Sequence, residues 1–112
     1  MVQPTTTSTL LACDLTAIDA AEREAHQALA ARLLTEIALE TQELADGYAF
    51  RFPAEVYPDV VAFVANERLC CPFFTFMLEV TPGRGPLWLR ITGPDGVKAM
   101  LRSGPNTEKP MR

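Results

Sequence analysis

The adjacent cysteines Cys70 and Cys71 are followed by Pro72, and this run constrains the fold more than any other part of the sequence. Proline has no backbone N–H group, and its ring disfavours helical backbone at the residue before it. A helix that reaches Cys71 is therefore expected to end there. This would place both thiols beside the C-terminal carbonyl groups of that helix.

Two long helices are predicted from residue composition and hydrophobic spacing. The first begins at residues 16–19, which resemble a capping box, and runs to about Leu44 through residues of high helix propensity. Asp46 and Gly47 follow it and are typical of a helix end. The second helix is expected over residues 57–71, with a proline suited to its first turn.

Four strands are expected where apolar residues alternate with others between turn-forming residues. A turn rich in Gly and Pro separates the last two strands, which should therefore pair antiparallel. A short helix carrying Val97, Met100 and Leu101 follows them. The predicted strands are residues 9–13, 48–52, 74–80 and 87–91.

The resulting order, β-α-β-α-β-β-α, indicates an α+β fold with one domain over residues 9–103. Its two layers are a small mixed sheet and the helices packed on one face of that sheet. Residues 1–8 are expected to form a flexible leader and residues 104–112 a flexible tail. Met77 and Trp88 should lie on the sheet face away from the helices, where an apolar patch would favour a homodimer.

Composition excludes several classes of protein. A chain of 112 residues, 48% of them hydrophobic, has room for one core. A net charge of −4 with scattered Lys and Arg is not that of a nucleic-acid-binding protein. The sequence shows neither a signal peptide nor an apolar run of the roughly 18 residues that span a bilayer. We therefore expect a cytoplasmic protein without a membrane partner, whose three cysteines stay reduced and form no disulfide framework.

Two polar side chains are predicted to face the core. His26, the one histidine, lies on the apolar face of the first helix, and Glu67 lies on that of the second, one turn before Cys71. A buried carboxylate without a partner costs on the order of several kcal/mol, so Glu67 needs a polar neighbour. Glu67 either pairs with Arg51 or Arg68 in a structural ion pair or extends its carboxylate to solvent at the edge of the helix. The functional alternative is that it exchanges protons with a thiol. His26 is either a hydrogen-bonded core residue or a partner of Glu67 or of a metal.

The cysteines are the strongest candidates for chemistry. Thiolates bind soft metals such as Hg, Cu(I), Zn and trivalent arsenic, some of which need only two or three sulfur ligands. Cys70 and Cys71 are the principal candidate ligands, and Cys13 would supply a third sulfur if the first strand lies beneath the second helix. Against this, the chain has no CxxC spacing, and a helix C-terminus disfavours a thiolate. The alternative is that Cys71 is a small core residue and Cys70 its neighbour, since free cysteine is often buried.

Four segments carry a family resemblance, namely residues 12–16, 46–53, 67–73 and 87–96. On these segments the chain resembles a family of small bacterial proteins, largely uncharacterised, that share a phenylalanine-rich Cys-Cys-Pro-Phe segment. The resemblance covers about residues 10–102. It implies the domain boundaries given above and no particular activity.

Three hypotheses follow for function. The leading one is a cytoplasmic protein that binds a soft metal ion or metalloid for detoxification or trafficking, with Cys70, Cys71 and Cys13 as sulfur ligands. Glu67 would relay protons and His26 would support the site or serve as an alternative ligand, and binding would release protons. The second is a small thiol-dependent enzyme or redox protein that uses Cys70 or Cys71 with Glu67. The third is a noncatalytic homodimeric module with buried, inert cysteines.

Overall fold

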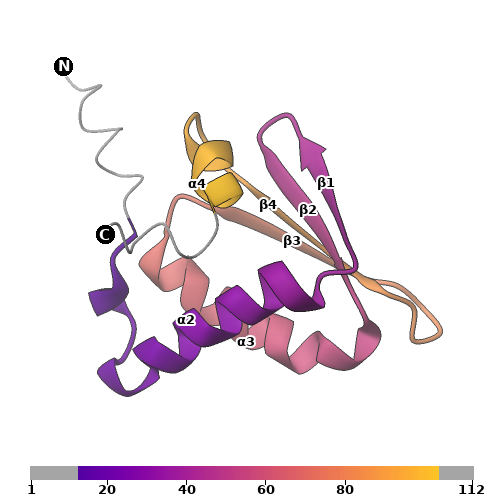
Figure 1. The fold of residues 1–112 in the computed structure, drawn as a ribbon, viewed down its shortest axis with the longest axis horizontal. Coiled ribbons are helices and arrows are strands. Elements are labelled where there is room, and N and C mark those ends of the chain that lie inside the picture. Colours follow the sequence, from indigo (N-terminus) through magenta and orange to yellow (C-terminus); the bar gives the residue numbers. More distant parts are fainter. Residues whose placement is uncertain (1–12, 104–112) are drawn as a thin grey trace.

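Four strands form one antiparallel sheet in the computed structural model, which describes residues 13–103 (Figure 1). β2 and β4 are central, and β1 and β3 form the two edges. Every strand pair is antiparallel, whereas the sequence had suggested a mixed sheet. In spatial order the strands are β1 (Glu40–Leu44), β2 (Gly47–Phe52), β4 (Leu87–Thr92) and β3 (Thr75–Val80).

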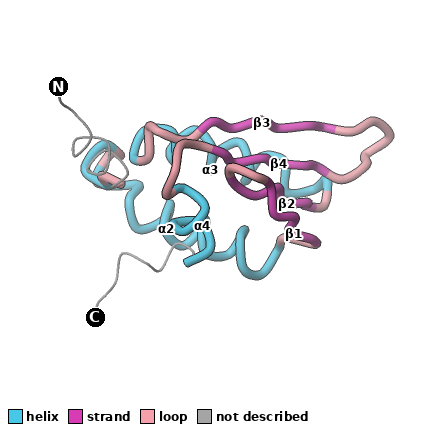
Figure 2. The backbone as a smooth tube through the Cα atoms, turned by 90° about the horizontal axis from the view of Figure 1, so that it is seen from above, coloured by secondary structure: helices cyan, strands magenta, loops and turns pink. Residues whose placement is uncertain are grey.

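Helices form the second layer of the molecule, so the predicted two-layer α+β architecture is confirmed (Figure 2). α2 and α3 lie side by side, and α4 contacts β2 (Figure 1). The α-helices of the described residues are α2 (Arg23–Arg32), α3 (Tyr57–Cys70) and α4 (Val97–Ser103). Shorter turns are the 3-10 segments η1 (Leu15–Ala17), η2 (Ala20–Glu22) and η4 (Ala54–Val56), and η3 (Leu33–Ile37) is a π-helical continuation of α2.

The helix α3 ends where the proline predicts. Cys71 leaves the helical conformation, with φ −127° and ψ 74°, while its N–H still donates to the carbonyl oxygen of Glu67 at 2.8 Å. Pro72 cannot supply the N–H that a further helical turn needs. Both cysteines therefore lie at the C-terminal end of α3, as predicted.

The first long helix ends earlier than predicted. The expectation that it continues to Leu44 is wrong, because the helical segment stops at Ile37 and β1 begins at Glu40. The N–H of Leu39 donates to the carbonyl oxygen of Arg51 in β2 at 2.7 Å, and Arg51 Nε donates to the Glu40 carboxylate at 3.0 Å. Pairing with β2 thus overrides the helix propensity of this stretch.

Three expectations fall on residues outside the described range 13–103. These are the strand over residues 9–13 apart from its last residue, the leader over 1–8 and the tail over 104–112. Cys13 itself is described, and it lies in no strand but two residues before the start of η1.

The core lies between the sheet and the helices α2 and α3. Leu87, Leu89 and Ile91 alternate along β4 and are at most 1% exposed. They belong to the same buried cluster as Val60 and Phe63 of α3. This packing fixes α3, and with it the two cysteines, relative to the sheet.

The opposite sheet face carries Met77 and Trp88, as the alternation predicts. Met77 is 56% exposed, and Trp88 follows the buried Leu87 in β4 with its side chain on the other side. The homodimer expected from these two residues remains a prediction.

Gly47 is required where β2 meets β4. A Cβ atom at Gly47 would lie 1.9 Å from the carbonyl oxygen of Ile91, which is backbone and has no rotamer to change. We expect Gly47→Ala to lower the free energy of unfolding by about 1–3 kcal/mol, as overpacking does. Urea denaturation would measure the change in the free energy of unfolding. Gly83→Ala is the control, because a Cβ atom at Gly83 would have no atom within 4 Å and any cost there comes from its positive φ alone. An unchanged midpoint for Gly47→Ala would contradict this β2–β4 contact.

Candidate functional site

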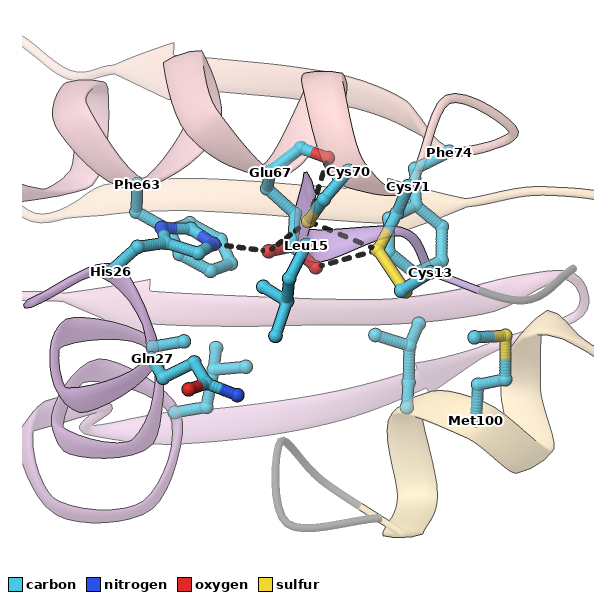
Figure 3. Close-up of a pocket in the computed structure, with 13 residues that line it drawn as sticks. Cys13, Leu15, His26, Gln27, Phe63, Glu67, Cys70, Cys71, Phe74 and Met100 are labelled. Atoms are coloured by element: carbon cyan, nitrogen blue, oxygen red, sulfur yellow. Dashed lines mark hydrogen bonds and ion pairs between the residues drawn. A yellow bond between two sulfur atoms is a disulfide. The ribbon is translucent and has the colours of Figure 1, made fainter. Parts of the chain in front are cut away.

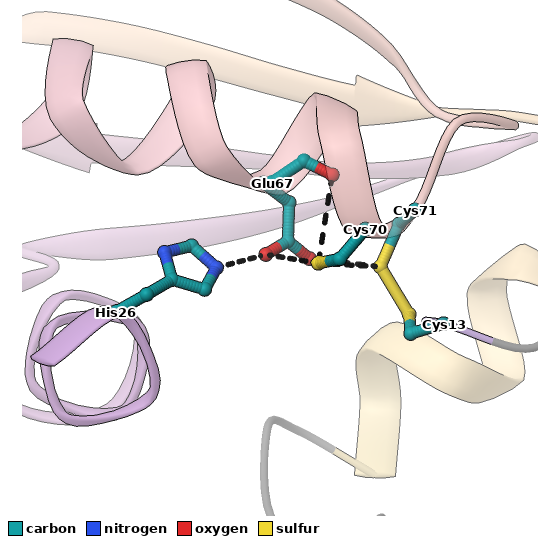
Figure 4. Close-up of a disulfide and its surroundings, with 5 residues drawn as sticks. All are labelled: Cys13, His26, Glu67, Cys70 and Cys71. Carbon is teal, nitrogen blue, oxygen red and sulfur yellow. Dashed lines mark hydrogen bonds and ion pairs between the residues drawn. A yellow bond between two sulfur atoms is a disulfide. The ribbon is translucent and has the colours of Figure 1, made fainter. Parts of the chain in front are cut away.

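The carboxylate of Glu67 lies between a histidine ring and two cysteine sulfurs (Figure 4). His26 Nε2 is 2.8 Å from Glu67 Oε1, and Cys71 Sγ is 3.4 Å from Glu67 Oε2. Cys70 Sγ is 3.9 Å from Glu67 Oε1 and 3.6 Å from Cys71 Sγ. Five polar or sulfur-containing groups from three segments thus meet, once Cys13 is included.

Helical spacing explains how two elements supply this cluster. Glu67 and Cys71 are four residues apart and therefore lie on one face at the end of α3. His26 is 4% exposed and reaches the cluster from the facing helix α2. Its ring stacks on Phe63, with 5.8 Å between centroids and 17° between planes. The prediction that His26 faces the core is confirmed, and of the alternatives left open by the sequence, the structure shows the contact between His26 and Glu67 rather than a pair with Arg51 or Arg68.

The third segment brings Cys13, which forms a disulfide with Cys71 (Figures 3 and 4). The expectation that all three cysteines stay reduced is therefore wrong for this structure. The sequence suggested a position of Cys13 near Cys71 only as a third sulfur ligand of a metal. Sequence spacing could not predict the bond, because the two residues are 58 positions apart and converge through the fold alone.

Cys70 lies outside the disulfide and is buried, with 2% of its surface exposed. Its thiol can donate toward the backbone oxygen of Glu67 at 3.8 Å or toward Oε1 at 3.9 Å. Cys71 carries no proton in the disulfide, so its 3.4 Å approach to Glu67 Oε2 is a contact and becomes a hydrogen bond only after reduction. The carboxylate is thus placed to accept a proton from either thiol.

The environment of His26 favours one arrangement of its protons. Nδ1 is buried and has no hydrogen-bond partner among residues 13–103. An Nε2 lone pair would face the carboxylate, so the geometry favours a ring that carries a proton on Nε2 and donates it to Glu67 Oε1.

The segment that carries Cys13 is anchored by contacts other than the disulfide bond. The N–H of Asp14 donates to the carbonyl oxygen of Cys70 at 2.8 Å, and Ile18 is 1% exposed in a cluster with Cys70 and Cys71. Asp14 also caps η1, because its Oδ1 accepts from the N–H of Thr16 at 3.0 Å. Hydrogen bonds from the Thr16 hydroxyl and N–H lower the pKa of Asp14 below its ordinary value.

A cavity of about 60 Å³ adjoins the cluster (Figure 3). His26, Glu67 and the three cysteines all line it, so the side chains singled out in the sequence share one site. The sequence did not identify the residues that complete the wall, since their apolar character marks them only as core. These include Leu15, Ala30, Leu34, Phe63 and Phe74.

The donor atoms suit a metal ion in type and spacing. One ligand atom each from His26, Glu67 and Cys70 lies within 4.8 Å of the other two. Imidazole and thiolate together suit zinc and copper, and thiolate selects soft ions generally. The cluster could therefore hold such an ion, and reduction of the disulfide would add two further sulfurs.

Comparison with known proteins identifies no relative: no family model, curated protein or solved structure matches the chain. Membership of the family with the Cys-Cys-Pro-Phe segment remains a prediction. Within residues 13–103, every helix is too short or too polar to cross a bilayer.

Proposed function

We propose that the reduced protein binds one soft metal ion or metalloid, with Cys70 and Cys71 as its principal ligands. The observation that carries the proposal is the 3.6 Å distance between their sulfurs. Two thiolates bound at 2.3 Å to one tetrahedral ion are about 3.8 Å apart. The two sulfurs therefore need to move little in order to chelate an ion together.

Further ligands are at hand in the same cluster. Glu67 contacts both sulfurs, so it can take up the protons that the thiols lose and pass them to solvent. His26 either keeps Glu67 in place through Nε2 or binds the ion through that atom. Cys13, once released from the disulfide, is the third sulfur, and its anchored segment keeps it near.

The redox state of the protein should decide whether it binds. A disulfide sulfur is not a thiolate and makes a poor ligand, so in the oxidised protein only Cys70 remains of the chelating pair. The same chain in its oxidised form is therefore a matched control for the reduced form.

Native mass spectrometry would test the proposal. Reduced protein, oxidised protein and a reduced Cys70→Ser/Cys71→Ser variant are each titrated with Hg(II), Cu(I), Zn(II) and As(III). We expect one tight equivalent of at least one ion on reduced protein, affinity lower by at least a hundredfold in the oxidised form, and none in the variant. Circular dichroism confirms that each sample is folded, and an increase in Tm on ion addition reports binding independently.

Two outcomes would overturn the proposal. One is folded reduced protein that takes up no ion stoichiometrically. The other is uptake that persists in the double variant, which would place the ion elsewhere. A reduced Glu67→Gln variant refines the result, because it keeps the size of the side chain and removes its charge, and it should weaken binding about 10–100-fold.

A further inference from the structure

The two sulfurs of the disulfide lie in very different surroundings. Cys71 is 1% exposed, at the inner end of the bond, against Cys70 and Glu67. Cys13, at the other end of the bond, is only half-buried (Figure 4). An external reagent can therefore approach Cys13 far more readily than Cys71.

Thiol–disulfide exchange makes this asymmetry chemically important. A thiolate attacks one sulfur of a disulfide, forms a mixed disulfide with it and expels the other sulfur. The space beside Cys71 Sγ already holds Cys70 Sγ at 3.6 Å and Glu67 Oε2 at 3.4 Å. Attack from outside is therefore directed to Cys13, and Cys71 becomes the leaving group.

A buried acid–base group lies next to the Cys71 thiolate that leaves. Cys71 departs as a thiolate with the electron pair of the broken S–S bond, next to the carboxyl group of Glu67. The proton that the attacking thiol has lost can reach Cys71 through Glu67, whose other oxygen is 2.8 Å from His26 Nε2. Glu67, which is oriented by His26, thus provides the proton route on the buried side of the bond.

We propose that Cys13 is a site of reversible S-thiolation by low-molecular-weight thiols of the cysteine-containing peptide class. One external thiol and the protein disulfide yield a mixed disulfide on Cys13 and a protonated thiol on Cys71, so that atoms and electrons balance without another oxidant or reductant. The product leaves Cys70 and Cys71 as an adjacent pair of thiols. This last consequence rests on the proposed function, whereas the position of thiolation does not.

Reduced glutathione is the probe for the test. Oxidised protein is incubated with glutathione, quenched with N-ethylmaleimide after partial exchange, digested with trypsin and analysed by tandem mass spectrometry. Cleavage after Arg23, Arg68 and Arg84 separates Cys13 from the Cys70–Cys71 pair into different peptides. We expect at least tenfold more glutathione on the Cys13 peptide, and the same preference in Cys70→Ser, which keeps the disulfide.

A second variant covers the case in which the mixed disulfide closes again too quickly to be trapped. In Cys71→Ser no internal disulfide can reform with Cys13, and oxidised glutathione should label Cys13 at least tenfold faster than the buried Cys70. Equal labelling of the two, or glutathione mainly on the peptide with Cys70 and Cys71 in the first experiment, would overturn the assignment. No metal is present in either experiment, so the result is separate from that of the metal titration.

Discussion

Cys13→Ser is expected to lower the free energy of unfolding by about 4 kcal/mol in buffer without reductant, on the chain-entropy estimate. The disulfide joins residues 58 positions apart, so its loss frees a long loop in the unfolded chain. Serine has almost the size of cysteine, and the Asp14 hydrogen bond to Cys70 does not depend on the sulfur. Chemical denaturation monitored by circular dichroism would measure the difference.

Reductant supplies the control for this prediction. With dithiothreitol present, wild type and Cys13→Ser should unfold at nearly the same denaturant concentration, because neither then contains the bond. A large difference that persists in reductant would mean that Cys13 stabilises the fold through packing rather than through the disulfide.

Phe63→Ala is expected to lower the free energy of unfolding by about 3–5 kcal/mol, as the same change does at other buried phenylalanines. Phe63 is 1% exposed in the main core cluster, and its ring also stacks on His26. Truncation leaves a cavity between α3 and the sheet and removes the surface that positions the imidazole. Urea denaturation would give the stability, and the reduced variant should also bind metal more weakly than wild type if His26 positions Glu67.

Val61→Ala is the matched control on the same helix. Val61 is 42% exposed, so its truncation should change the free energy of unfolding by no more than about 0.5 kcal/mol. Equal costs for Phe63→Ala and Val61→Ala would contradict the burial of the α3 face that carries Phe63 and Glu67.

Helical periodicity and one proline predict much of the candidate site. Pro72 sets the end of α3, and spacing along each helix places His26 and Glu67 on inward faces. Pattern alone could not choose the partner of Glu67, since Arg51 and Arg68 are equally consistent with it. The choice depends on packing between α2 and α3, and Arg51 is in fact paired with Glu40.

Two features depend on contacts that are distant in sequence. The stretch Glu40–Leu44 has good helix propensity, but it becomes a strand because β2 offers an unpaired edge beside it. The Cys13–Cys71 bond depends on how the segment before η1 docks against α3. That docking rests on Ile18 and on one backbone hydrogen bond, neither of which forms a recognisable motif.

The contacts that anchor this segment apart from the disulfide bond determine how that bond can open and close. The Asp14 hydrogen bond and the burial of Ile18 do not require the disulfide bond, so we expect the segment to stay in position when that bond is reduced. Cys13 then faces Cys71 as an intramolecular partner, at an effective concentration on the order of millimolar or above. The disulfide can form again without a large movement of the chain. External thiols that react with Cys13 must compete with the nearby Cys71 thiol. We therefore expect the Cys13–Cys71 bond to be reduced and to form again repeatedly without unfolding of the protein.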